Sequence, residues 1–141
     1  MKIALGADHG GFQLKNEVLN YLKSKGYETI DFGTNSTASV DYPDFAKKVG
    51  EAVVSGQCDF GVLVCTTGIG ISMAANKIKG VRAALCHNED CAKFSRLHNN
   101  ANIICMGQKY IGKELAERMV QTFLDTQFEG GRHQRRVDLF S

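Results

Sequence analysis

The chain has 141 residues, of which 43% are hydrophobic and 23% are charged, as is typical of one soluble globular domain with a full core. The net charge of +2 argues against general nucleic-acid binding, and no apolar run approaches the roughly 20 residues of a membrane span. The N-terminus lacks the apolar stretch of a signal peptide because Asp8 follows too soon, so we expect a cytoplasmic protein with no membrane partner.

Strand-like and helix-like segments alternate along the chain, and helix-stop glycines and capping residues mark their limits. In order, the predicted elements are strand Lys2–Ala7, helix Phe12–Lys25, strand Tyr27–Phe32, helix Asp41–Ser55, strand Gly61–Cys65, helix Ile69–Ile78, strand Arg82–Cys86, helix Asn88–Leu97, strand Asn102–Met106 and helix Gly112–Asp125. A polar loop at 33–40 and a tail at 130–141 are predicted to hold no element.

This alternation predicts a three-layer α/β/α, Rossmann-like domain with a five-stranded parallel sheet. We expect a single domain over residues 1–141, whose C-terminal tail from about residue 127 packs outside the core. Open parallel sheets bind ligands at the carboxyl ends of their strands, where the winding direction switches. If the first and third strands are neighbours, the loops 8–11 and 65–70 meet at that point.

The loop from Cys65 to Gly70 places a cysteine between a buried strand and the start of a helix. Backbone N–H groups and the positive end of a helix dipole converge there, which predicts a stabilised thiolate beside an anion site. The alternative is a buried cysteine that acts as a small hydrophobe, a reading that suits Cys86 and Cys105. The five cysteines include no Cys-x-x-Cys pair, so free thiols are expected, and neither a zinc knuckle nor a thioredoxin-like motif is predicted.

Two short motifs contain groups suited to proton transfer. Asp8-His9 follows the first strand directly, although a loop-stabilising carboxylate beside a surface histidine is a nearly equal alternative. His98-Asn99 ends the fourth helix, where the alternative is a histidine that complements the helix dipole.

The tail carries Arg132, Arg135 and Arg136 behind two glycines, and arginine suits phosphate because its planar donors bind bidentately. A solvated basic end is the alternative, which we favour for Arg135. The glycine turn matches neither a P-loop nor a complete dinucleotide fingerprint. The residues alone therefore predict a phosphate-binding α/β domain with a reactive cysteine.

In combination, the motifs resemble ribose-5-phosphate isomerase type B, whose family includes the galactose-6-phosphate isomerase subunits. The resemblance rests on Asp8-His9-Gly-Gly-Phe12, Asp41-Tyr-Pro43, Cys65-Thr-Thr-Gly-Ile-Gly70, Ala75-Asn-Lys77, His98-Asn99 and Gly130-Gly-Arg-His-Gln134 in this order. It covers essentially the whole chain. It implies interconversion of D-ribose 5-phosphate and D-ribulose 5-phosphate in the non-oxidative pentose phosphate pathway, without a metal ion or organic cofactor.

The resemblance also implies a role for each site residue. Cys65 would move a proton between C2 and C1 through a cis-enediolate, while Thr67 and the turn amides hold the oxyanion. His98 would assist ring opening, with Asp8 nearby. The substrate-binding residues that it implies are Asp8, His9, Thr66, Thr67, Gly68, Ile69, Gly70, Asn99, Lys109, Arg132 and Arg136, of which His9, Arg132 and Arg136 would hold the phosphate.

The family forms homodimers or homotetramers with shared sites, so the resemblance implies that His98 comes from a neighbouring subunit. Two positions depart from the family pattern. Thr66 stands where many members have Gly, and Lys109 stands where many have Arg, which keeps the charge but loses the bidentate fork.

Three alternative functions stay open at the level of sequence. A six-carbon aldose phosphate, such as allose 6-phosphate or galactose 6-phosphate, is the first. A cysteine hydrolase with Cys65 as nucleophile and His98 as base is the second. A sugar-phosphate sensor without turnover is the third.

Overall fold

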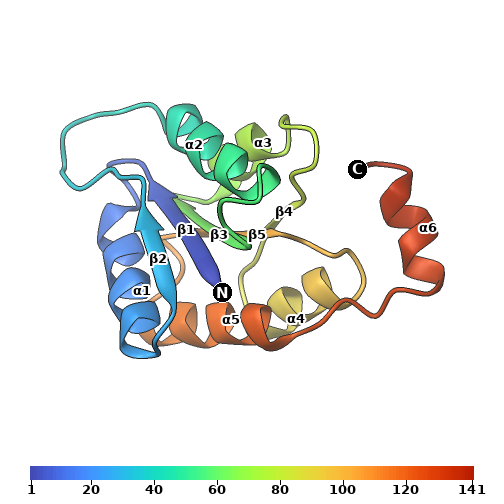
Figure 1. The fold of residues 1–141 in the computed structure, drawn as a ribbon. Helices are drawn as coiled ribbons and strands as arrows, with labels where there is room; N and C mark the ends of the chain where they lie inside the picture. The colour runs from blue at the N-terminus through green and yellow to red at the C-terminus, as the bar shows by residue number, and fades with distance from the viewer.

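Five parallel strands form one sheet in the order β2-β1-β3-β5-β4 (Figure 1). The strands are β1 (Lys2–Ala7), β2 (Glu28–Asp31), β3 (Phe60–Cys65), β4 (Ala83–Leu85) and β5 (Ile103–Gly107). The helices are α1 (Phe12–Ser24), α2 (Tyr42–Val54), α3 (Ile69–Ala75), α4 (Glu89–Leu97), α5 (Lys113–Asp125) and α6 (Arg132–Asp138). This computed structural model describes residues 1–141. It confirms the predicted α/β fold, and β1 pairs with β3.

Each predicted element is present, but two predictions near the site need correction. The helix expected over 69–78 ends at Ala75, because the amides of Lys77 and Ile78 bond to carbonyls three residues back and tighten the chain into a turn. The tail expected to hold no element contains α6, whose His133 and Val137 are buried four residues apart.

Helices cover both faces of the sheet and divide the core into two clusters (Figure 1). On one face, α1, α4 and α5 pack against side chains such as Ile3, Val62 and Ile104. On the other face, α2 and α3 pack against side chains such as Leu63 and Ile103. Successive residues of a strand point to opposite faces, so a sheet covered twice needs continuous apolar strands. No helix is long and apolar enough to cross a membrane.

The carboxyl ends and the amino ends of the strands carry different parts of the chain. In Figure 1, β1 and β2 point to the upper left, whereas α6 stands at the right. The carboxyl ends of the strands carry the loops after Ala7 and Cys65. The amino ends carry the turn between α4 and β5, because a helix between two parallel strands runs back along the sheet.

A buried ion pair fastens α1 to the edge strand β2. The side chain of Lys15 is 0% exposed, and its Nζ donates to Asp31 Oδ1 at 2.7 Å and to Asn35 Oδ1 at 2.8 Å. Burial lowers the pKa of Lys15 despite its partner. Burial also opposes ionisation of Asp31, but hydrogen bonds from Lys15 and the Gly33 amide outweigh it and lower the pKa of that carboxyl. Hydrogen bonds from neighbouring groups therefore stabilise both charges in place of water.

We expect Asp31→Ala to lower the free energy of unfolding by about 3–5 kcal/mol, because it leaves a buried ammonium without its counter-charge. Urea denaturation measures the change. The matched control is Glu28→Ala on the same strand, which removes an exposed pair with Lys2 at 3.7 Å and should cost no more than about 1 kcal/mol. Equal losses in the two variants would contradict the assigned role of Lys15–Asp31.

Candidate active site

Two loops meet at the carboxyl ends of β1 and β3, as the strand order requires. Gly10 and Gly11 lie directly against the other loop: a Cβ at Gly10 would overlap the Thr66 hydroxyl, and one at Gly11 would overlap the Val64 carbonyl. Asp8 is only 6% exposed, and its Oδ1 accepts a hydrogen bond from the Gly10 amide at 2.9 Å. The glycines therefore allow the acidic loop to approach the cysteine loop.

Cys65 is the last residue of β3 and is 5% exposed. The backbone N–H of Gly68 donates to its sulfur at 3.1 Å, and the N–H of Ile69 donates to Thr67 Oγ1 at 3.2 Å. Gly68 has φ +81°, and a Cβ there would lie 2.6 Å from Leu85 Cδ1. The turn thus folds the Gly68 amide back over the sulfur, an arrangement that suits negative charge at this point.

The cysteine opens onto a cavity of about 420 Å³. The cavity is lined by Asp8, Tyr42, Cys65, Thr66, Thr67, Ile69 and Gly70. A second cavity of about 470 Å³ shares Thr67 and Ile69 and adds His87, Tyr110 and Ile111. Thiol, carboxylate, hydroxyl and amide groups therefore face a space of the size that small ligands occupy.

The other buried cysteines are unsuited to proton transfer. Burial raises the pKa of Cys86 to about 12 and that of Cys105 well above its usual range. Burial also raises the pKa of Cys58. None of these thiols lines a cavity, so the sequence-based interpretation of Cys86 and Cys105 as small hydrophobes agrees with the structure.

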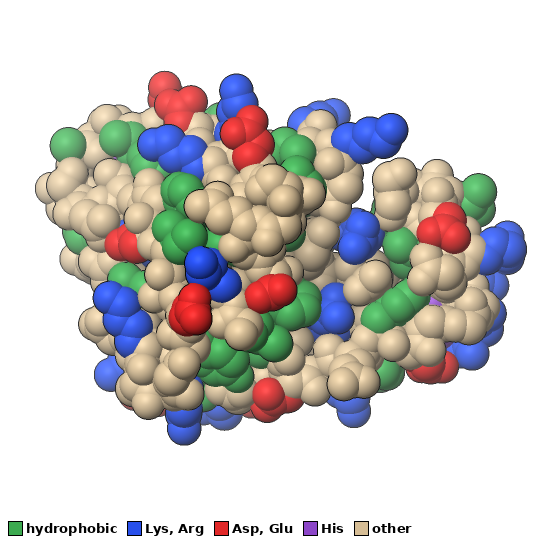
Figure 2. Space-filling model, viewed as in Figure 1, with side chains coloured by type: hydrophobic (Ala, Val, Ile, Leu, Met, Phe, Trp, Pro, Cys, Tyr) green, Lys and Arg blue, Asp and Glu red, His purple; other side chains and the backbone are tan.

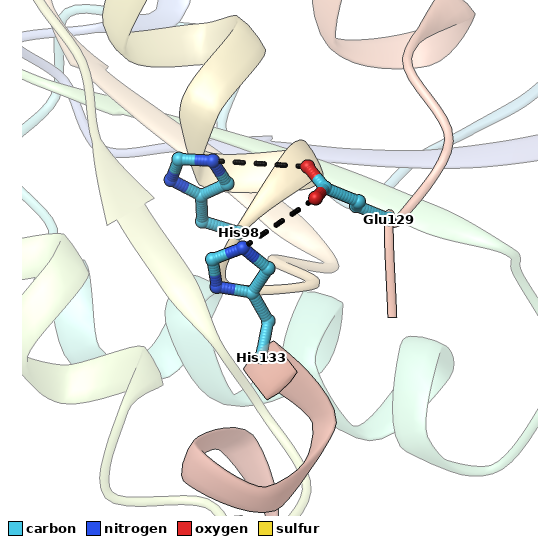
Figure 3. A group of neighbouring side chains, drawn as sticks. All are labelled: His98, Glu129 and His133. Carbon is cyan, nitrogen blue, oxygen red and sulfur yellow. Dashed lines mark ion pairs between the residues drawn. The ribbon is translucent and has the colours of Figure 1, made fainter. Parts of the chain in front are cut away.

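A second cluster of functional side chains lies where α4 and α6 meet (Figure 3). The rings of His98 and His133 stack with centroids 4.2 Å apart. Both Nε2 atoms face the Glu129 carboxylate, each at 3.9 Å, and Arg132 Nη1 lies 3.7 Å from the same group. Burial, together with electrostatic interactions with His98 and Arg132, lowers the pKa of His133. Figure 2 shows basic side chains along the outer side of α6, whose basic residues other than His133 are arginines.

The structure brings some of the predicted site residues together within one chain and separates others. Asp8, Thr66, Thr67 and the turn surround Cys65, and the Lys109 amide donates to the Thr66 carbonyl at 3.0 Å. His9 lies on the same loop, and its Nδ1 accepts a hydrogen bond from the Val40 amide at 3.2 Å.

The remaining predicted residues lie near the amino ends of the strands. His98 caps the end of α4, and Arg132 and Arg136 lie on α6. Asn99 lines a separate cavity of about 430 Å³ with Arg82 and Phe140. None of these four residues lines the cavity at Cys65.

Sequence reasoning missed two participants. Tyr42 lines the cysteine cavity, and its ring lies 2.6 Å from the position of a Cβ on Gly70, so it closes one wall. The only sequence feature that pointed to Tyr42 was its position beside Pro43, where the second predicted helix begins. Glu129 is the acidic centre of the histidine cluster, and its only signal was its position just before the glycine pair of the tail.

The fold and the crevice define a doubly wound α/β protein with a cysteine-bearing ligand site at its topological switch point. Residues 3–140 match the Ribose/Galactose Isomerase family, and the chain belongs to that family. It is 48% identical over 137 residues to ribose-5-phosphate isomerase B of Escherichia coli K12, which covers 97% of this chain and 92% of that protein.

Solved structures agree with this assignment. Ribose-5-phosphate isomerase B of Clostridium thermocellum matches with a TM-score of 0.97 and 55% identity, over 99% of this chain and 94% of that one. A ribose 5-phosphate isomerase from Thermotoga maritima matches with a TM-score of 0.97 and 53% identity, over 99% and 96% of the two chains.

Proposed function

We propose that this chain interconverts D-ribose 5-phosphate and D-ribulose 5-phosphate by moving a proton through a cis-enediolate. The observation that carries the proposal is the Cys65 thiol, which faces a cavity beside Asp8 and receives the Gly68 amide, in a chain whose relatives are named for this reaction. Five free cysteines suit a reducing compartment, so we place the activity in the cytoplasm.

The chemistry needs a base and a site for developing negative charge. Cys65 removes the proton from C2 and returns a proton at C1, while a second proton passes from the C2 hydroxyl to the C1 oxygen. The enediolate oxygen is held by the turn amides with Thr67. An enzyme accelerates this step only if it binds the enediolate better than the sugar. One oxyanion donor is worth roughly 2.7–4 kcal/mol in acyl-transfer sites, so a turn with several amides can supply a large share of the barrier reduction. Asp8 faces the same cavity and acts beside the base.

Ring opening and phosphate binding require groups that this chain holds elsewhere. Cys65 lies at the carboxyl ends of the strands, and the end of α4 lies near their amino ends. A six-residue strand such as β3 spans roughly 16 Å, which separates the two places. We therefore propose that a second copy supplies His98, Asn99 and the arginines of α6. With two-fold symmetry the exchange is mutual, and a dimer contains two complete sites.

Exposed apolar side chains around the crevice support this self-association. Ile69 is 46% exposed, Met73 64% and Tyr110 57%, and Ile69 and Tyr110 line the adjoining cavity. Clustered exposed apolar and aromatic groups are typical of protein interfaces.

We expect Arg132→Ala to raise KM for ribose 5-phosphate about tenfold or more, because a hydrogen bond between charged groups contributes roughly 1.5–3 kcal/mol. Steady-state kinetics measures the effect. The matched control is Arg135→Ala on the same helix, which should leave KM within about twofold. An unchanged KM in Arg132→Ala would remove this residue from the phosphate site.

The test of the function is a conversion assay on purified protein with five-carbon and six-carbon aldose phosphates. We expect turnover with ribose 5-phosphate and a much lower kcat/KM with allose 6-phosphate and galactose 6-phosphate. A preference for a six-carbon substrate would reassign the substrate. Binding without turnover of any sugar phosphate would support a sensor and contradict the proposal.

A further inference from the structure

The cluster of His98, Glu129 and His133 joins the end of α4 to the segment at the start of α6, about thirty residues further along the chain (Figure 3). His98 stands at the end of α4, Glu129 lies in the segment before α6, and His133 lies in the first turn of α6. One imidazole nitrogen from each histidine and a carboxylate oxygen lie within 4.8 Å of one another. Figure 3 shows both histidine Nε2 atoms facing the Glu129 carboxylate.

One nitrogen in this cluster has no partner. The side chain of His133 is 10% exposed, and its Nε2 makes no hydrogen bond although it is fully buried. The nearest Glu129 oxygen is 3.9 Å away, which is beyond hydrogen-bond distance. Buried polar atoms are nearly always satisfied, so an unpaired nitrogen aimed at a carboxylate indicates a missing ligand.

We propose that His98, Glu129 and His133 form a binding site for a divalent transition-metal ion such as Zn²⁺. Zinc takes imidazole nitrogen and carboxylate oxygen ligands at about 2.0–2.2 Å, usually in a tetrahedron. Ligand atoms of a tetrahedron of this size lie about 3.3 Å apart, and each histidine nitrogen lies 3.9 Å from a Glu129 oxygen. Because the two rings are stacked 4.2 Å apart at 13°, one imidazole must turn out of the stack so that both ring planes meet at the metal. His98 and Glu129 are 36% and 44% exposed, which leaves an open side for entry and for a water molecule as fourth ligand.

Nearby positive charge limits the affinity of the site for a cation, and the donor atoms determine which metal it prefers. Arg132 lies 3.7 Å from Glu129, but its side chain is 68% exposed and can turn into solvent when a cation arrives. Arg136 adds positive charge near His133. Two imidazoles favour zinc and similar metals, whereas Mg²⁺ and Ca²⁺ require oxygen ligands.

Zinc bound at this site affects the reaction, and this consequence rests on the proposed function. A zinc ion on His98 uses the imidazole that assists ring opening and draws Glu129 away from Arg132. Zinc therefore inhibits the isomerase.

Metal binding is measured first, independently of activity, by equilibrium dialysis of the full chain against ZnCl₂ in a buffer that does not chelate zinc. We expect one bound Zn²⁺ per chain. Glu129→Gln and His133→Gln should each weaken binding at least tenfold, because each removes a ligand. His87→Gln is the matched control, since this exposed histidine lies outside the cluster, and it should bind as the unmodified protein does.

Cobalt distinguishes the cluster from the free cysteines. Co²⁺ at a site with two histidines and a carboxylate should give tetrahedral visible bands without a thiolate charge-transfer band. Absence of zinc binding, equal binding in His133→Gln, or a cobalt–thiolate band would each overturn the proposal. Circular dichroism confirms that each variant is folded, and Glu129→Gln preserves the side-chain shape should His133→Gln fail to fold.

The activity measurement separates this proposal from the proposed function. Each protein is compared with itself in the presence and absence of zinc. Zinc should inhibit the unmodified protein at concentrations at least tenfold below those that inhibit Glu129→Gln. Zinc binding in a protein without isomerase activity would contradict the proposed function alone, whereas turnover without zinc binding would overturn the metal site alone.

Discussion

Replacing Cys65 with alanine is expected to lower kcat for ribose 5-phosphate by about 10²–10⁴-fold, the usual contribution of a positioned acid or base. The sulfur lines the cavity at the end of β3 and is the only thiol that lines any cavity. The substitution leaves the phosphate and ring-opening groups in place, so KM should change much less than kcat. A coupled assay of ketose formation measures both constants.

The matched control is Cys91→Ala, which removes an exposed free thiol from the first turn of α4. It should retain at least half of the unmodified kcat. Thermal unfolding of Cys65→Ala should show an intact fold, because only one small buried group is lost. Near-normal turnover in a folded Cys65→Ala protein would contradict the assignment of the base.

Mixing two inactive variants is expected to restore activity. Cys65→Ala lacks the base and His98→Ala lacks the ring-opening group, so each homodimer should be nearly inactive on the cyclic sugar. In a heterodimer of the two, one site carries both defects and the other carries neither. Random exchange makes half of the dimers mixed, so about one quarter of all sites should be intact.

Native mass spectrometry verifies subunit exchange when the two variants carry tags of different mass. The control is the double variant with both substitutions in one chain, mixed with Cys65→Ala, which can form no intact site. A mixture that exchanges subunits but stays inactive would show that Cys65 and His98 do not act across an interface. Recovery near one quarter would exclude a site built within one chain.

Much of the fold was predictable because the signals are local. Short apolar runs bounded by glycines mark the strands, and apolar residues at four-residue spacing mark the long helices. The end of α3 was predicted too late, since hydrophobic spacing continues to Ile78 while the backbone already tightens after Ala75. The seven-residue α6 was missed because it buries only His133 and Val137 and is otherwise polar.

The site was predictable where it follows from topology. The strand order places the loops after β1 and β3 in contact, so Asp8 and Cys65 were expected to meet and do. The wall formed by Tyr42 depends on how α2 packs over the glycine turn, which no local pattern encodes. The position of Glu129 between two histidines likewise depends on where α6 folds back.

The most direct test of the central claim follows the hydrogen on C2 of ribose 5-phosphate. The protein is incubated with this sugar in D₂O, and both sugars are analysed by NMR. Because the Cys65 thiol exchanges its hydrogen with solvent before it returns one to the sugar, proton transfer predicts deuterium at C1 of the ribulose 5-phosphate and at C2 of the remaining ribose 5-phosphate, and neither in Cys65→Ala. Conversion with the original C2 hydrogen fully retained at C1 would contradict the proposed mechanism.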